Sequence, residues 1–159
     1  MNPYYNFRIT SKFEKRINPI SNLPEFHRGI DFAPNEKHET YAGISGSVRL
    51  AESREKEGNF VQIATEINKV SFYCNLFHNK KLLVNKGDKV KINSIVAISG
   101  STGYSTGEHI HNEIFTYSSS DPFIIEIKKT VNFWYCDDGR LFFDPLDLYK
   151  FFDDKNINY

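Results

Sequence analysis

Short runs in which hydrophobic and polar residues alternate, separated by turn-forming residues, make up most of the chain. Successive side chains of a strand point to opposite faces, so this alternation is typical of strands that are buried on one side. Glycine, proline and asparagine between the runs predict turns. The strands expected from this pattern are residues 7–13, 28–34, 45–51, 59–65, 69–77 and 108–115, with a further one after the turn at Gly87-Asp88.

The last third of the chain gives a different pattern. The stretches "FIIEIKKTVNFWYC" (123–136) and "RLFF" (140–143) predict a hairpin around the tight turn at Asp138-Gly139. "PLDLYKFFDD" (145–154) is the best helix candidate, since a proline is tolerated in a first helical turn. "RINPISNLPEF" (16–26), with two prolines, reads as an irregular loop.

These elements predict an all-β protein, mostly antiparallel, with a short C-terminal helix. The chain shows no repeat, linker or low-complexity segment, so residues 1–159 are expected to form one domain. The abundant aromatic residues, 14 Phe and 9 Tyr, suit a β-rich core or a groove lined with rings.

Charge and apolar content exclude several classes of partner. Twenty basic residues balance twenty acidic ones, so nothing favours binding to nucleic acid or to an anionic membrane. No apolar run approaches the roughly 20 residues of a membrane span, and the N-terminus lacks the apolar core of a secretory signal. Cys74 and Cys136 fit no metal-binding spacing, and we expect them to be buried free thiols.

Candidate chemistry begins at "EHIHNEI" (108–114). On a strand, His109 and His111 point to the same face and Ile110 points to the other. A half-solvated edge strand without chemistry would explain the pair, and so would a metal or proton-transfer site with partners elsewhere in the chain.

"FHRGIDFAP" (26–34) supplies such partners. His27 and Asp31 are four residues apart across a glycine that lets the chain bend. Two histidines and one aspartate would hold zinc with a fourth position open for water, which is the arrangement of catalytic zinc sites. A second imidazole on the same face as a ligand histidine would supply an acid or base.

The order and context of these motifs resemble the lysostaphin-type zinc endopeptidases of bacterial cell walls. The resemblance covers residues 7–116 and 144–149, and its most specific part is "GDKV" followed by "SGSTGYSTGEHIHNEI". It implies that a β-sheet carries a substrate groove, that His27, Asp31 and His111 bind zinc, and that His109 is a catalytic histidine. The substrate it implies is a peptide of the peptidoglycan stem or cross-bridge.

One position departs from the family at a point that matters for catalysis. The family supplies a second catalytic histidine from a Tyr-x-His-Leu strand, and this chain reads "YCNL" (73–76), which puts Asn75 at the histidine position. An asparagine can orient water or an oxyanion but carries no proton, so the sequence leaves both reduced activity and no activity open. His78 is three residues further and should face away from Asn75, as a surface loop histidine; if the chain turns between them, His78 could substitute for the missing catalytic histidine. We expect His38 to be a solvated loop residue.

Other departures are Glu108 in place of a proline, Asn112 in place of an aromatic residue and Glu14 in place of a glycine. Glu108 would add negative charge beside His109 and raise its pKa, or would be an ordinary surface carboxylate. The predicted hairpin at residues 117–143 would be an insertion. It could wall the groove, bind a protein partner or only stabilise the C-terminal end.

Three functions remain open from the sequence. The first is an active zinc endopeptidase acting on peptidoglycan, with Tyr41, Tyr104 and residues 100–107 lining its groove. The second is a pseudoenzyme that binds peptidoglycan or regulates another cell-wall hydrolase. The third is a phage virion component. Without a visible signal, the protein would be phage-encoded, exported by another route or truncated, and its compartment is not predicted.

Overall fold

The computed structural model describes residues 1–159. Two helices and one 3-10 turn accompany the strands: η1 (Pro3–Asn6), α1 (Pro122–Ile127) and α2 (Pro145–Asp154). The strands are β1 (Ile9–Ser11), β2 (Lys15–Ile17), β3 (Pro24–Phe26), β4 (Ile30–Phe32), β5 (Glu39–Tyr41), β6 (Gly46–Arg54), β7 (Gly58–Ile67), β8 (Val70–Asn79), β9 (Lys81–Leu82), β10 (Lys89–Val90), β11 (Ile95–Ile98), β12 (Ile110–Thr116), β13 (Phe133–Tyr135) and β14 (Leu141–Phe143).

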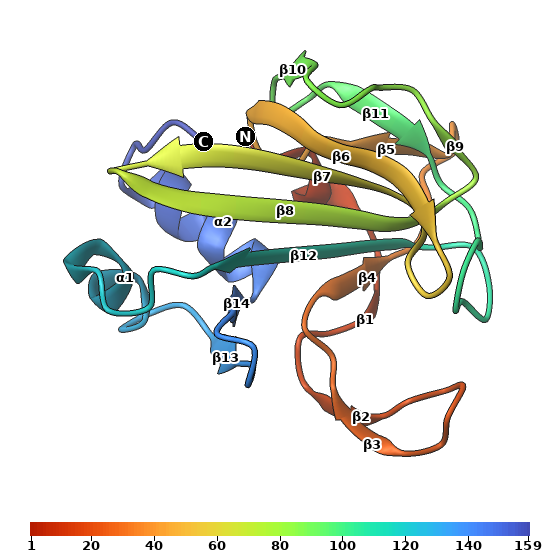
Figure 1. Cartoon of the computed structure of the whole chain (residues 1–159), viewed down its shortest axis with the longest axis horizontal. Coiled ribbons are helices and arrows are strands. Elements are labelled where there is room, and N and C mark those ends of the chain that lie inside the picture. The colour runs from red at the N-terminus through yellow and green to blue at the C-terminus, as the bar shows by residue number, and fades with distance from the viewer.

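A nine-stranded sheet forms the centre of the molecule (Figure 1). Its main path runs β1-β4-β12-β8-β7-β6-β10, and β14 joins on the side of β12 and carries β13. A three-stranded sheet (β5-β11-β9) and the β2–β3 hairpin complete the architecture. All the pairings are antiparallel, so the all-β antiparallel prediction is confirmed.

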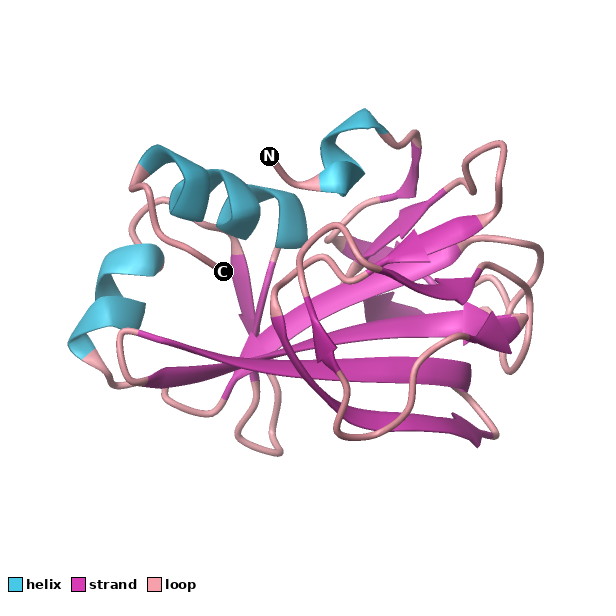
Figure 2. Cartoon of the chain, turned by 90° about the horizontal axis from the view of Figure 1, so that it is seen from above, coloured by secondary structure: helices cyan, strands magenta, loops and turns pink.

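One face of the sheet packs into the core, and the helices gather along that side of the molecule (Figure 2). Along β8, the alternate residues Val70, Phe72, Cys74 and Leu76 are buried in this core. The predicted C-terminal helix forms at α2, where Asp144 caps the first turn and Leu148, Tyr149 and Phe152 are buried. The opposite face of the central strands is therefore left for polar side chains.

The prediction that the C-terminal hairpin begins at residue 123 is wrong. Residues 122–127 form α1, not a strand, because the Asp121 side chain caps the helix by accepting from the Phe123 amide and Pro122 fits the first turn. Ile124 and Ile127 lie on one helical face and are buried. The second half of the prediction holds, since β13 and β14 pair around the turn at residues 137–140.

The segment predicted as an irregular loop is an ordered hairpin. β2 and β3 pair in the register Arg16↔Glu25 and extend away from the main sheet (Figure 1). The Phe26 ring at its base stacks on Trp134 with centroids 4.1 Å apart and planes 6° from parallel. The C-terminal segment thus packs against the hairpin that leads to His27.

Both cysteines are free, as expected, but only Cys74 is fully buried; Cys136 is half-buried. No helix in the structure has the length and apolar character needed to cross a membrane.

Candidate active site

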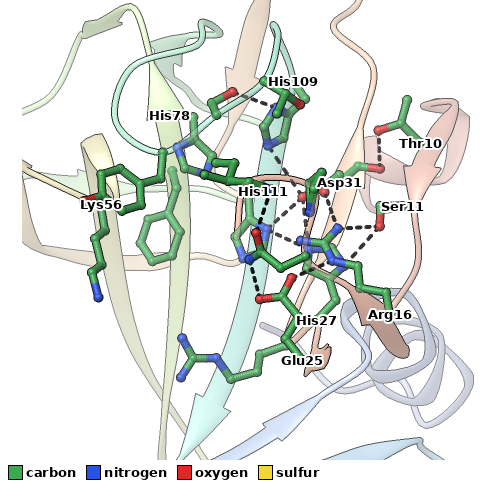
Figure 3. A pocket seen from close by; sticks show the side chains of 18 of the residues that line it. Thr10, Ser11, Arg16, Glu25, His27, Asp31, Lys56, His78, His109 and His111 are labelled. Atoms are coloured by element: carbon green, nitrogen blue, oxygen red, sulfur yellow. Dashed lines mark hydrogen bonds and ion pairs between the residues drawn. The ribbon is translucent and has the colours of Figure 1, made fainter. Parts of the chain in front are cut away.

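The three side chains predicted as metal ligands, His27, Asp31 and His111, converge in one cleft of the molecule (Figure 3). His27 Nε2 lies 3.1 Å from His111 Nδ1 and 3.2 Å from Asp31 Oδ1, and the last two atoms are 2.8 Å apart. Zinc bonds of about 2.0–2.2 Å at tetrahedral angles place neighbouring donors roughly 3.3–3.5 Å apart. The three donors therefore fit one zinc ion if His111 Nδ1 and Asp31 Oδ1 separate by about 0.5–0.7 Å and the other two pairs by less, and two imidazoles with one carboxylate suit that metal.

Strand register explains how residues 80 positions apart meet. Asp31 and His111 are direct partners in the β4–β12 pairing, so their side chains leave the sheet side by side. His27 is fixed just after β3, where its amide donates to the Glu14 carbonyl over 2.9 Å. Gly29 permits the close approach, because a Cβ there would lie 2.4 Å from the Asn112 carbonyl oxygen and 2.9 Å from the His111 ring.

The outer nitrogens of the two ligand rings set their tautomers. His27 Nδ1 lies 2.6 Å from the Lys12 carbonyl oxygen, which can only accept, so Nδ1 carries the hydrogen and Nε2 keeps its lone pair. His111 is turned the other way: Nδ1 faces the triad and Nε2 faces Glu113 Oε2 at 3.5 Å. Once the nitrogens that face the triad have lost their protons, both rings would direct a lone pair at the same point, as metal ligation requires.

Two further imidazoles border this centre. His109 Nε2 lies 3.7 Å from Asp31 Oδ1, while its Nδ1 is 2.8 Å from the Gly107 carbonyl oxygen. The His78 ring lies with its centroid 4.9 Å from that of His109 and 6.1 Å from that of His111. His78 Nδ1 is 2.9 Å from the Thr102 carbonyl oxygen, so in the neutral ring Nε2 is the free acceptor.

His78 reaches the cleft because β8 is not a regular strand. Val61 pairs with Leu76 and Asn59 pairs with Asn79, so β8 has one residue more than β7 in this interval. His78 adopts φ +63°, which reverses the side on which its side chain leaves the strand. Bulges often re-aim a side chain next to a functional site. The expectation of a surface histidine is wrong, because His78 is 8% exposed.

Asn75 does not line the cleft. It is buried, and its amide donates to Glu113 Oε1 over 2.7 Å and accepts from Gln62 over 2.9 Å. Glu113 in turn faces His111. Asn75 therefore belongs to a polar row across β7, β8 and β12 that supports a metal ligand, and the second imidazole in the cleft, beside that of His109, is the His78 ring.

Burial and neighbouring charges shift the pKa values of these groups in opposite directions. Burial lowers the pKa of His78 to about 4, helped by the charge of His111. Burial disfavours the charged form of His111 as well, but its contacts with Asp31 and Glu113 outweigh this and raise its pKa to about 9. Burial lowers the pKa of His27. Burial opposes ionisation of Asp31, but its bonds with the two histidines hold its pKa well below the usual range.

The side chains lie in a cleft of about 630 Å³. One wall is the β2–β3 hairpin, and the other combines the β6–β7 turn, with Lys56, and residues 104–107 of the predicted lining loop; residues 100–103 do not line the cleft. Tyr104 lines the cleft as predicted; Tyr41 is not among the lining residues, and its hydroxyl donates to Glu39.

The remaining departures have structural roles. Glu108 Oε1 lies 2.6 Å from both His38 Nδ1 and Ser99 Oγ. His38 is exposed as predicted. The buried Asn112 side chain donates to the Tyr149 hydroxyl over 2.9 Å and so ties β12 to α2.

A comparison with protein families identifies the group to which this arrangement belongs. The model of peptidase family M23 matches residues 25–122, which include all three donors and both additional histidines. The chain belongs to peptidase family M23. The resemblance to lysostaphin-type enzymes seen in the sequence is thereby confirmed, and the family implies zinc as the metal.

Individual relatives and solved structures agree with the assignment of this chain to family M23. The chain is 33% identical to the peptidoglycan DD-endopeptidase ShyA of Vibrio cholerae over 109 residues, or 68% of this chain and 25% of the relative. A zinc-containing peptidase from Vibrio cholerae superposes with a TM-score of 0.59 at 35% identity, over 68% of this chain and 33% of that one. The catalytic domain of lysostaphin from Staphylococcus simulans gives 0.62 at 28% identity, over 70% and 82%. The chain spans between 25% and 29% of the length of the first three curated relatives that it matches.

Proposed function

We propose that this chain is a zinc-dependent endopeptidase that cleaves peptide bonds in the stems or cross-bridges of bacterial peptidoglycan. The observation that carries the proposal is the convergence of three metal donors and two further imidazoles on one open cleft. The printed names of relatives, among them a peptidoglycan DD-endopeptidase, supply the substrate class.

The residues divide the chemistry between them. His27, Asp31 and His111 would hold zinc, which when bound supplies a Lewis acid that polarises a carbonyl oxygen and makes water more acidic. The rings of His78 and His109 each have Nδ1 bonded to a carbonyl, so each neutral ring offers an Nε2 lone pair. Either ring can take the proton of the attacking water and, once protonated, donate Nε2–H to an oxyanion or to the leaving amine.

The location of His78 also bears on the choice between an enzyme and a pseudoenzyme. The main reason to expect reduced activity is the asparagine in place of a second catalytic histidine, and the cleft has a second imidazole in His78, whose ring centroid lies 4.9 Å from that of His109. Glu108 and Asn112, the other unusual residues, bond away from the metal donors. These contacts support the active enzyme.

The direct test is release of new amino termini from purified peptidoglycan, measured with the zinc-loaded chain, after chelation and after zinc is restored. Sacculi cross-linked directly between stem peptides and sacculi with glycine bridges should be compared. We expect zinc-dependent release from at least one. A chain that binds zinc yet releases nothing from either would contradict the proposal, and sedimentation of that chain with the sacculi would favour the binding module.

A further inference from the structure

Arg16 reaches the metal centre from outside the main sheet. It lies on β2 of the projecting hairpin, and its Nη1 donates to Asp31 Oδ2 over 3.3 Å and to Ser11 Oγ over 2.7 Å (Figure 3). Its Nε donates to Glu25 Oε1 over 2.8 Å. Three acceptors on three different strands thus fix one guanidinium that is about one quarter exposed.

The two oxygens of the Asp31 carboxylate have separate partners. Oδ1 faces His27 and His111, whereas Oδ2 faces Arg16. Rotation about the Cβ–Cγ bond would exchange the oxygens or direct both at a metal ion. A planar guanidinium held on its other sides opposes that rotation, because the hydrogen bond to Oδ2 would be lost.

The same guanidinium is linked to a second donor residue. Ser11 Oγ, which accepts from Arg16, lies 3.5 Å from His27 Nδ1. His27 is therefore flanked by a group that Arg16 holds in place, although its main partner is the Lys12 carbonyl.

We propose that Arg16 is a positioning residue of the metal centre, which holds the Asp31 carboxylate with Oδ1 directed at the two histidines. The inference rests on the proposed metal centre and not on the identity of the substrate. Groups that hydrogen-bond a ligating carboxylate typically account for a 10–100-fold change in metal affinity.

A positioning role and a simple charge effect predict opposite results. The positive charge of Arg16 close to a divalent cation is repulsive, so if charge alone mattered, its removal would tighten zinc binding. If orientation of Asp31 matters more, its removal weakens zinc binding. The sign of the change therefore decides between the two.

The experiment is a zinc titration of the whole chain in competition with a chromophoric chelator. We expect Arg16→Ala to weaken zinc affinity about 10–100-fold and Arg16→Lys, which can reach one acceptor but lacks the planar fork, to recover part of the loss. Lys15→Ala is the matched control, because it removes one positive charge from the same strand and Lys15 makes no contact with the donors. It should bind zinc as the wild type does.

Two further measurements exclude a general loss of structure. The thermal unfolding of each variant in chelator should match that of the wild type, and if Arg16→Ala fails to fold, Arg16→Gln takes its place. The absorption spectrum of the cobalt-substituted protein, which reports coordination geometry, should change for Arg16→Ala and not for Lys15→Ala. Unchanged or tighter zinc binding by Arg16→Ala or Arg16→Gln would overturn the proposal. A wild type that binds no zinc would overturn both it and the proposed metal centre.

Discussion

The rings of His78 and His109 lie with centroids 4.9 Å apart, and the Nδ1 atom of each is bonded to a carbonyl of the same loop, Thr102 and Gly107 respectively. One glycine-rich and serine-rich loop at residues 101–107 therefore orients both imidazoles. Backbone carbonyls make the shortest contacts to the two rings, and the Ser105 hydroxyl, 3.3 Å from His109 Nδ1, adds one side-chain contact.

Replacement of either imidazole should abolish most activity without loss of the metal. We expect His78→Ala and His109→Ala each to reduce peptide release about 10²–10⁴-fold, since each removes an acid–base group. Zinc affinity should stay close to that of the wild type, because neither residue belongs to the donor set. His38→Ala is the control: this exposed histidine should be dispensable. Full activity of His78→Ala would assign His78 a purely structural role.

Asn75→His should not increase activity, although the family pattern alone would suggest it. Asn75 is buried and donates to Glu113, so an imidazole there would be overpacked and would not reach the cleft. Asn75→Ala should cost about 1–3 kcal/mol of unfolding free energy, because the Glu113 carboxylate loses a buried donor. Urea unfolding and peptide release measure the two effects. A faster Asn75→His variant would show that the catalytic position is residue 75 after all.

Zinc binding should become tighter as pH rises through neutrality. The raised pKa of His111, about 9, means that zinc must displace a proton from this ring at pH 7. The pKa of His27 is lowered, so that ring is already neutral there. We expect about one proton released per zinc ion and roughly a tenfold gain in apparent affinity per pH unit between 7 and 8.5. Calorimetry in buffers of different ionisation enthalpy measures this proton count, and a count near zero or two would contradict the assignment.

Gly29→Ala should disrupt the metal centre by a steric clash, without any change of charge or of a metal donor. The added Cβ would meet the Asn112 carbonyl oxygen at 2.4 Å and the His111 ring at 2.9 Å, so β4 and β12 would have to separate. We expect weaker zinc binding and a lower melting temperature. Gly107→Ala is the matched control, since a Cβ there meets nothing within 4 Å. Equal behaviour of the two variants would show that the approach of β4 to β12 is not constrained.

The sequence predicted the main strands and the C-terminal helix because each depends on local pattern, and the metal donors were implied by the family resemblance of two motifs, since Asp31 and His111 are 80 positions apart. The wrong expectation that His78 lies on the surface has a specific cause. Counting by twos along β8 assumes a regular strand, and the bulge before Asn79 breaks the count. The only trace of it in the sequence is that Phe77, His78 and Asn79 interrupt the alternation that holds up to Leu76.

Two other differences arise from capping and from distant pairing. Asp121 followed by Pro122 is a helix-start signal that the hydrophobic run at residues 123–127 obscured. The β2–β3 pairing is supported by Arg16, Glu25 and the stack on Trp134, and the last lies more than 100 positions away along the chain. The predictions of one domain, of an insertion at residues 117–143 and of a protein partner there stay predictions.

The stack between Phe26 and Trp134 has a consequence for transferring this M23 segment between proteins of the family. The family match ends at residue 122, yet β14 pairs with the strand that carries His111, and Trp134 covers the residue next to His27. A chimera joined at residue 122 would leave the edge of β12 unpaired and remove the support of the first donor. The smallest portable unit therefore runs through α2, and swap junctions belong after it.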